Sequence, residues 1–239
     1  MLTCMKRLRE QIAAGIQALG LCAPQGAAEA LARHIDMVLE ANAQFNLTSI
    51  DPGDAVSLHV LDSCAAVPLL GSAPLGSFAD IGSGAGFPGI PLAVMTNRTV
   101  ALVESVGKKA AFLERVVAEL RLDATVHRAR AEELAQTQAE SFSAVTARAL
   151  SSLPSLVELA APLLRRDGLL ICLKGEPKEV ELERGRMAAA LCGMREERVV
   201  RLSIPGTDAR RCVIVYRRSG RPRVRLPRRP GMAQHEPLA

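Results

Sequence analysis

Residues 77–104 read SFADIGSGAGFPGIPLAVMTNRTVALVE, and this stretch decides the fold. Its apolar runs predict a short buried strand over Phe78–Ile81 and a second strand over 99–103. A glycine-dense turn and a helix connect the two. The stretch is therefore expected to form a βαβ unit, the repeating element of an α/β sheet.

Glycines occupy four positions of the turn: 82, 84, 86 and 89. Because glycine has no Cβ, the backbone can turn sharply there and approach a ligand closely. Its N–H groups then lie at the start of the following helix, where electron-rich ligand atoms are favoured. Glu104 closes the second strand 22 residues after Gly82, where an acid can accept both ribose hydroxyls. We therefore predict a nucleoside-cofactor site that includes Gly82, Gly84 and Glu104.

An acid ahead of the glycines narrows the choice of cofactor. The pattern G-x-G-x-x-G begins at Gly84, but alone it is weak evidence for a dinucleotide. Asp80 stands two residues before Gly82, where a carboxylate would repel a pyrophosphate and tolerate a cation. The run acid-x-Gly-x-Gly-x-Gly resembles the first motif of S-adenosylmethionine (SAM) methyltransferases, whose cofactor carries a sulfonium and no phosphate. A glycine-rich turn in another kind of α/β protein is the alternative.

The composition limits the class of protein. The 239 residues suffice for one large domain, or for one domain with a small extension. Hydrophobic residues make up 49% and aromatic residues only 3%, so the core must be aliphatic. No run reaches the roughly 18 apolar residues of a membrane span, and no signal-peptide pattern occurs. We expect a cytoplasmic protein.

Six cysteines lie far apart, with no C-x-x-C and no neighbouring histidine pair. This spacing fits neither a zinc site nor a disulfide framework. We expect most of them to be small buried hydrophobic residues, and we predict no metal.

Residues 217–239 hold the positive charge of the chain. They contain seven arginines and one acidic residue, Glu236, a balance of +6, whereas the remaining residues sum to −1. Because this segment is rich in proline and glycine, it is predicted to be extended and mobile in isolation. We interpret it as an arm that binds phosphates in a salt-dependent way, with a merely solubilising end as the alternative.

Residues 1–71 predict a helical segment packed on the core. Apolar residues recur at helical spacing in two stretches, and Pro24 lies between them. A third helix, over 54–70, places His59 and Asp62 at positions i and i+3, hence on one face. A structural hydrogen bond is the commoner explanation of such a pair, and a catalytic pair is the alternative.

Strands and helices alternate after the glycine-rich stretch. We predict three further strands and a closing hairpin: 123–127, 143–147, 169–173, and 199–202 with 212–217. Such alternation implies a mostly parallel sheet, to which the hairpin adds an antiparallel edge. The expected fold is α/β, a Rossmann-like doubly wound sheet over 72–216 that binds the cofactor, preceded by the helical extension and followed by the basic tail.

Loops at the carboxyl ends of the strands face the cofactor crevice of such a sheet. Ala131 and Glu132 follow the third strand, where they are placed to touch an adenine. Arg148 follows the fourth strand among small residues, and a role in the site competes with that of an ordinary surface arginine. Lys174 follows the fifth strand.

Several motifs in a fixed order resemble those of the RsmG (GidB) family, which methylates 16S ribosomal RNA. The resemblance covers nearly the whole chain and is far more specific than the glycine turn. The motifs are FNLTS (45–49), HVLDS (59–63), DIGSGAGFPGIPL (80–92), ESVGKKAAFL (104–113), the pair Ala131-Glu132, TARAL (146–150), LKG (173–175) and PRRPG (227–231).

The resemblance implies a SAM-dependent methyltransferase with the class I fold. Its target would be N7 of a guanine in the decoding-region loop of 16S rRNA, in the small ribosomal subunit, and we expect a monomer. By motif match the SAM-binding residues would be Gly82, Phe87, Ala131, Glu132 and Arg148. The family positions near the substrate side are Asn46, His59, Asp62 and Lys174.

Two departures from the family pattern bear on the site. Leu58 stands where many relatives have a basic residue before the histidine, which would remove one RNA contact. Ala41 stands where a tryptophan is common, which would leave the pocket wall thinner.

The absence of certain catalytic residues near the fourth strand is consistent with methylation of guanine N7. Guanine N7 has a lone pair and no proton to lose, so direct attack on a methyl group needs no general base. Methylation of a pyrimidine carbon would need a cysteine near the fourth strand, and amino-group methylation goes with an (Asn/Asp)-Pro-Pro-aromatic loop; VTARAL (145–150) offers neither.

Two rival classes stay open: a methyltransferase of small molecules or proteins, and a non-catalytic assembly partner that binds SAM or NAD. The basic tail and the RNA-type motifs disfavour the first class, and the intact site motifs disfavour the second.

Overall fold

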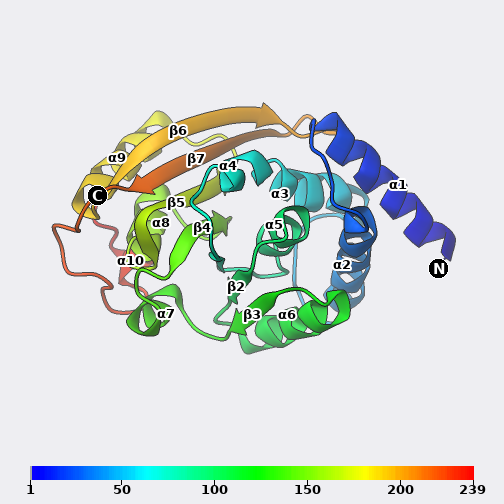
Figure 1. Ribbon diagram of the computed structural model, residues 1–239, viewed down its shortest axis with the longest axis horizontal. Coiled ribbons are helices and arrows are strands. Elements are labelled where there is room, and N and C mark those ends of the chain that lie inside the picture. Colours follow the sequence, from blue (N-terminus) through cyan, green and yellow to red (C-terminus); the bar gives the residue numbers. More distant parts are fainter. Residues whose placement is uncertain (1) are drawn as a thin grey trace.

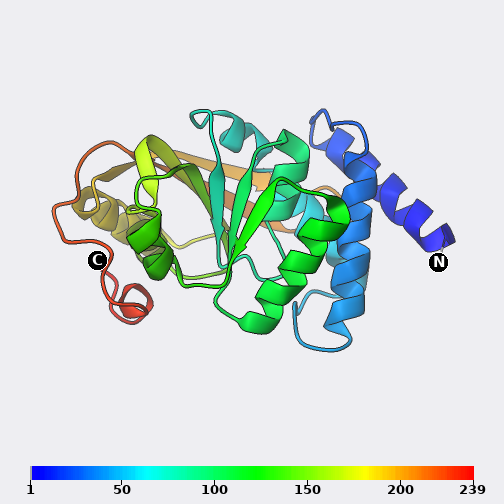
Figure 2. The same cartoon turned by 60° about the horizontal axis from the view of Figure 1, so that its bottom comes forward.

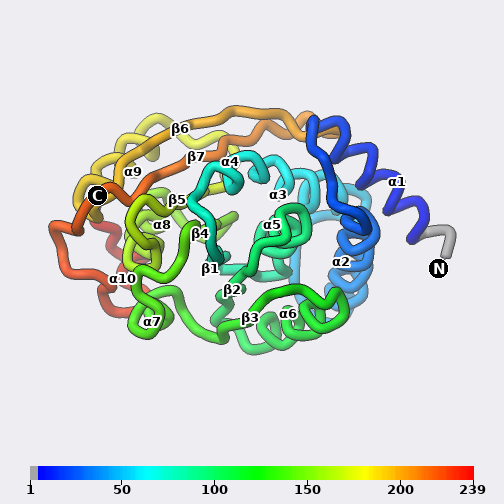
Figure 3. The backbone as a smooth tube through the Cα atoms, viewed as in Figure 1, coloured from blue at the N-terminus to red at the C-terminus, as the bar shows by residue number. Residues whose placement is uncertain are grey.

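A seven-stranded sheet with helices on both faces forms the body of the molecule (Figure 1). The computed structural model describes residues 2–239, and Figure 3 traces their backbone. The strands are β1 (Phe78–Ile81), β2 (Val100–Val103), β3 (Ala124–His127), β4 (Phe142–Arg148), β5 (Leu164–Lys174), β6 (Met194–Ser203) and β7 (Arg210–Arg218). The helices are α1 (Leu2–Ala18), α2 (Ala27–Asn42), α3 (Asp62–Cys64), α4 (Val67–Gly71), α5 (Gly89–Thr96), α6 (Gly107–Leu120), α7 (Ala131–Thr137), α8 (Leu153–Ala160), α9 (Glu179–Leu191) and α10 (Met232–His235).

The strand order is β3-β2-β1-β4-β5-β7-β6. β1 pairs in parallel with both β2 and β4, so the order of the strands reverses there. Ligands of open α/β sheets bind in the crevice outside the carboxyl ends of the strands at such a point. β7 runs antiparallel to both β5 and β6, so the predicted parallel sheet with an antiparallel closing hairpin is confirmed.

Side chains of alternating residues form two separate cores, one on each face of the sheet. Phe78 of β1 and Leu102 of β2 join the core beneath α2, α5 and α6, whereas Ala79 and Val103 join the core beneath α7, α8 and α9. Both cores are mainly aliphatic, as the composition predicts. Burial on both faces explains why these strands are continuous apolar runs rather than alternating ones.

The N-terminal helices pack on the first of these two cores. α1 lies against α2, and α2 lies against α5 and α6 (Figure 1). The single helix predicted over 54–70 is wrong, because the chain there forms a 3₁₀ turn (Pro52–Asp54), a π-helical segment (Val56–Leu61), α3 and α4. Pro68 explains the start of α4, since proline lacks the N–H that a continuing helix would use and fits the first turn of a new one.

In the folded chain the C-terminal tail packs against α8 and does not extend from the body as an arm, although its composition is that of a segment that is extended in isolation. Arg217 and Arg218 belong to β7. The residues after them pass along α8 and include the short helix α10 (Figure 2). The guanidinium of Arg228 bonds to Glu158, a carboxylate that is buried in the layer of α8. Composition predicts an extended segment here because it takes no account of the buried partners that the tail meets.

Four arginines of the tail stay exposed. In the described part of the chain their side chains have no hydrogen-bond or ion-pair partner; they are Arg221, Arg223, Arg225 and Arg229.

No helix among residues 2–239 is long and apolar enough to cross a lipid bilayer.

Candidate functional site

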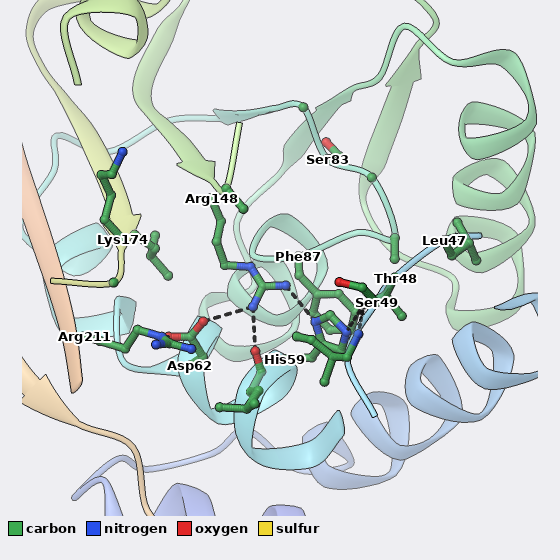
Figure 4. A pocket seen from close by; sticks show the side chains of 18 of the residues that line it. Leu47, Thr48, Ser49, His59, Asp62, Ser83, Phe87, Arg148, Lys174 and Arg211 are labelled. Atoms are coloured by element: carbon green, nitrogen blue, oxygen red, sulfur yellow. Dashed lines mark hydrogen bonds and ion pairs between the residues drawn. The ribbon is translucent and has the colours of Figure 1, made fainter. Parts of the chain in front are cut away.

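A cavity of about 520 Å³ opens at the carboxyl ends of β1, β4 and β5, where the fold predicts a ligand site (Figure 4). Seven residues predicted for the site line it: His59, Asp62, Gly82, Gly84, Phe87, Arg148 and Lys174. A smaller cavity of about 280 Å³ lies beside it and shares Gly82, Gly84, Lys109 and Ala149 with it. Glu104, Ala131 and Glu132 line this second cavity, as the sequence predicts for a nucleoside.

The glycine turn forms the wall between the two cavities. Gly82 has φ +70°, a left-handed conformation that favours glycine, and a Cβ there would lie 2.6 Å from a methyl carbon of Leu150. Glu104 fixes the next turn, since its carboxylate accepts the N–H of Gly84 at 2.9 Å and that of Val106 at 2.7 Å. Each carboxylate oxygen has a second lone pair, so Glu104 can still accept further hydrogen bonds from a ligand.

Asp80 supports the turn from below and does not line either cavity. Its side chain is fully buried and accepts hydrogen bonds from the Thr146 hydroxyl at 2.8 Å and from the Gly89 N–H at 3.1 Å. Burial raises the pKa of this carboxyl to about 6. Without a ligand, the carboxylate of Asp80 anchors the start of α5 beneath the glycine turn, and a contact between Asp80 and the cofactor stays a prediction.

Arg148 is the centre of the larger cavity. Its guanidinium donates to the Leu58 carbonyl at 2.7 Å, to the Asp62 carboxylate at 3.0 Å and to His59 Nδ1 at 2.7 Å (Figure 4). It also lies 5.3 Å from the centre of the Phe87 ring. His59 and Asp62 do share one face, as predicted, but each bonds to Arg148 and not to the other. Arg148 thus lines the larger cavity as a largely buried, paired side chain and is not an ordinary surface arginine.

Arg211 joins the same cluster and was not predicted. Its Nε donates to Asp62 at 2.9 Å, so the carboxylate lies between two guanidinium groups. The antiparallel direction of β7 is the reason, because it brings the start of this strand beside Lys174 at the carboxyl end of β5. The predicted hairpin could have indicated Arg211. The second strand of the hairpin runs antiparallel to β5, so a basic residue at the start of that strand lies at the carboxyl end of β5, where the ligand edge is.

Phe87 is enclosed by two histidines from the N-terminal segment. Its ring stacks on His34 of α2 at a centroid distance of 4.5 Å and on His59 at 4.3 Å. The Nε2 of His34 donates to the carbonyl of Ala85 in the glycine turn at 2.8 Å. α2 therefore holds the turn directly, a contact that the helical spacing of the sequence did not reveal.

The hydrogen bonds around His59 fix the position of its proton. A guanidinium only donates, so Nδ1 must accept from Arg148, and the proton of the neutral ring lies on Nε2. Nε2 then donates to the hydroxyl oxygen of Thr48 at 2.8 Å, and this oxygen also accepts the N–H of Ile50 at 3.1 Å. The hydroxyl proton of Thr48, which lines the larger cavity, is left free to donate.

Two substrate-side predictions differ in their outcome. Asn46 is exposed and lies outside the residues that line either cavity, whereas its neighbour Thr48 lines the larger one. Lys174 does line the larger cavity, but its ammonium is bonded to the Ser151 carbonyl at 3.0 Å and to Glu181 at 2.6 Å. The structure therefore brings Lys174 to the edge of the site and leaves Asn46 outside it.

A family model described as GidB, rRNA small subunit methyltransferase G, matches residues 27–211. The chain belongs to the GidB family. The Ribosomal RNA small subunit methyltransferase G of Pelotomaculum thermopropionicum is 35% identical, over 98% of this chain and 100% of that protein. The protein of the same name from Roseiflexus castenholzii is 40% identical, over 92% and 95%. The family resemblance of the motifs is confirmed.

Solved structures confirm the class I methyltransferase fold for this GidB chain. A putative sarcosine dimethylglycine methyltransferase from Galdieria sulphuraria superposes with a TM-score of 0.54 at 11% identity, covering 73% of this chain and 91% of that one. M. jannaschii TYW2, solved in complex with AdoMet, superposes with a TM-score of 0.50 at 14% identity, covering 65% and 74%.

None of the described cysteines of this GidB chain lines either of the two cavities. Cys172 pairs with Ala147 across β4 and β5 but is fully buried, and burial raises the pKa of its thiol. Cys64, Cys192 and Cys212 are buried as expected, Cys22 is exposed, and the side chain of Cys4 lies outside the described residues. Among residues 2–239, no three His, Cys, Asp or Glu side chains are grouped so as to hold a metal ion.

The two stacked histidines predict that the free energy of unfolding falls in acid. Burial lowers the pKa of His34 to about 4, and burial together with the charge of Arg148 lowers that of His59 to about 3. Between these values and the ordinary 6.5, the unfolded chain binds two protons that the folded chain does not, so falling pH favours unfolding. Asp80 has the opposite effect, because its pKa is raised to about 6. Below that pH the folded chain binds a proton at Asp80 that the unfolded chain does not, which offsets the contribution of one histidine.

Urea unfolding between about pH 4.5 and 6.5 measures this dependence, which amounts to about 1.4 kcal/mol per pH unit for each net proton. His34→Gln should lower the slope of the unfolding free energy against pH by the contribution of one proton. An equal slope in His34→Gln and the wild type would contradict the assignment.

Proposed function

We propose that this chain transfers a methyl group from SAM to N7 of a guanine in the decoding-region loop of 16S rRNA. The observation that carries the proposal is the pair of adjacent cavities on either side of the glycine turn, one suited to a nucleoside and one centred on Arg148. GidB membership supports the rRNA substrate, because the curated relatives are named as small-subunit rRNA methyltransferases.

The residues around the smaller cavity fit the adenosine part of SAM. Glu104 keeps free lone pairs for the two ribose hydroxyls, and Ala131 and Glu132 line the region beyond it. Gly82 and Gly84 line both cavities, so the methionine part would pass along the turn toward Phe87 and Arg148. When bound, SAM supplies an electrophilic methyl group.

The larger cavity suits a guanine that needs alignment and no general base. His59 is a poor base, because its Nδ1 already accepts from Arg148 and its pKa is lowered to about 3. No cysteine lines either cavity, so a thiolate attack on a pyrimidine carbon has no candidate residue. Orientation alone can lower a barrier by roughly 7–11 kcal/mol at its ceiling.

Fixed donors in the larger cavity would orient the base. Arg148 can donate to the acceptor edge of a guanine, and the free hydroxyl proton of Thr48 is a second donor. Asp62 and His59 act by holding Arg148 in place, and Lys174 and Arg211 add positive charge at the edge of the cavity. Asn46 would contact RNA outside the cavity.

Further parts of the proposal concern partners and organisation. The small ribosomal subunit is the expected substrate particle, and the chain acts as a monomer without a metal in the cytoplasm. The helical segment 1–71, the methyltransferase domain 72–216 and the tail 217–239 are its functional parts. The exposed arginines of the tail, together with Lys109 at the larger cavity, would contact phosphates.

Methyl transfer from labelled SAM to small subunits and to 16S rRNA lacking the modification tests the proposal. Borohydride–aniline cleavage then maps N7-methylguanine, and a single break in the decoding-region loop is the expected result. Label without cleavage would reject the N7 assignment. Absence of label on any RNA form, with SAM bound, would favour a small-molecule or protein substrate instead, and the absence of any turnover would favour a non-catalytic partner.

Gly82→Ala should abolish SAM binding, because a side chain at φ +70° is strained and its Cβ would collide with Leu150. Gly71→Ala is the matched control, since a Cβ there meets no atom within 4 Å. Calorimetric titration measures both variants. Wild-type affinity in Gly82→Ala would count against the assignment of the turn to the cofactor.

Replacing all four exposed tail arginines by glutamine should weaken RNA binding and flatten its salt dependence. Each lost phosphate contact lowers the slope of log K against log salt by about 0.7–0.9. Arg7→Gln with Arg115→Gln, exposed on α1 and α6, is the control. Filter binding at several salt concentrations measures the slopes, and equal slopes in the fourfold variant and the wild type would refute a phosphate-binding role of the tail.

A further inference from the structure

Two buried carboxylates outside the larger cavity take their partners from the C-terminal tail. Glu158 of α8 is 3% exposed and accepts two hydrogen bonds from Arg228, both at 2.6 Å. Glu132 of α7 is 4% exposed and accepts the backbone N–H of Gly231 at 2.7 Å. Because a buried carboxylate without a partner is costly, both contacts fix where the tail lies.

These contacts place α10 at the cofactor end of the molecule. α10 packs against α8, and its Ala233 is 1% exposed (Figures 1 and 2). The next residue, Gln234, lines the smaller cavity together with Glu104, Ala131 and Glu132. Glu132 therefore both lines this cavity and accepts a hydrogen bond from the backbone of the tail. A segment 99 residues away in sequence from Glu132 supplies part of the cavity wall.

We propose that the tail completes the cofactor site and that Gln234 contacts the adenine of SAM. The smaller cavity extends past Glu104, and the adenine lies beyond the ribose that Glu104 holds. A glutamine amide offers one donor group and one acceptor, the combination that adenine requires at its N6 amino group and neighbouring ring nitrogen. Gln234 is thus a specificity-determining residue for the base of the cofactor. The inference rests on the proposed function for the identity of the ligand.

The base specificity of cofactor binding tests the role of Gln234. Titration of the full chain with S-adenosylhomocysteine and with its inosine analogue, in which a carbonyl replaces the adenine amino group, should show tighter binding of the adenosine compound. Gln234→Ala should lower the affinity for the adenosine compound by about tenfold and remove the preference, as expected for loss of paired hydrogen bonds. His235→Ala, an exposed neighbour on α10, should change neither.

The outcomes separate this inference from the proposed function. Equal affinity and equal preference in Gln234→Ala and the wild type would overturn the role of Gln234 while leaving the methyltransferase assignment intact. A wild-type chain that binds neither compound would overturn the cofactor assignment itself, and this inference with it.

Limited trypsin digestion tests the position of the tail without any substitution. Arg223 and Arg225 are exposed and are not followed by proline, so they are the cleavage sites expected in the segment 219–229. If the tail forms part of the cofactor site, saturating S-adenosylhomocysteine must stabilise it by linkage and slow cleavage there. The protection should be weaker in Gln234→Ala. Cleavage at the same rate with and without the compound would contradict a tail that closes the cavity.

Discussion

The hydrogen bonding of Arg148 is the constraint on which the rest of the site depends. Its side chain is only 14% exposed at the end of β4, and a buried guanidinium must be paired on several sides because its desolvation is costly. The carbonyl of Leu58, the ring of His59 and the carboxylate of Asp62 supply the partners, all from one short helical segment. The segment must therefore dock on the sheet before the cavity exists, and the N-terminal helices belong to the site as much as the sheet does.

Aromatic stacking extends this constraint to the glycine turn. His59 is held by Arg148, Phe87 stacks between His59 and His34, and His34 bonds to the carbonyl of Ala85. The turn that separates the two cavities is thus fixed from both sides, by Glu104 on the strand side and by the ring stack on the helix side. Rigid placement of this kind is what methyl transfer without a general base demands, since alignment is then the main source of rate.

The sheet could be predicted from the sequence because the two features that reveal it, the apolar strands and the glycine-rich turn, are local. Buried strands are continuous apolar runs, and the turn after β1 is marked by its glycines, so the mostly parallel sheet with its antiparallel edge and the ligand edge followed from general rules. Gly82, Glu104, Ala131 and Arg148 were found in this way, each by its place at the end of a strand.

The features that the sequence did not reveal depend on distant partners. Asp80 precedes the glycines as a cofactor residue would, but the bonds from Thr146 and Gly89 turn it inward. Arg211 lies 149 residues from Asp62, and no local pattern joins them. The tail was expected to be extended because its composition is that of a flexible segment, whereas its course is fixed by the buried carboxylates of Glu132 and Glu158.

The attachment of the tail has a consequence for the biosynthesis of the protein. A chain emerges from the ribosome with its N-terminus first, so the sheet and its helices can form before residues 228–234 are free to move. Glu132 and Glu158 must then wait for partners that are translated 99 and 70 residues later. Loss of residues 228–239 would leave every strand in place and yet remove both partners and the Gln234 side chain that lines the smaller cavity.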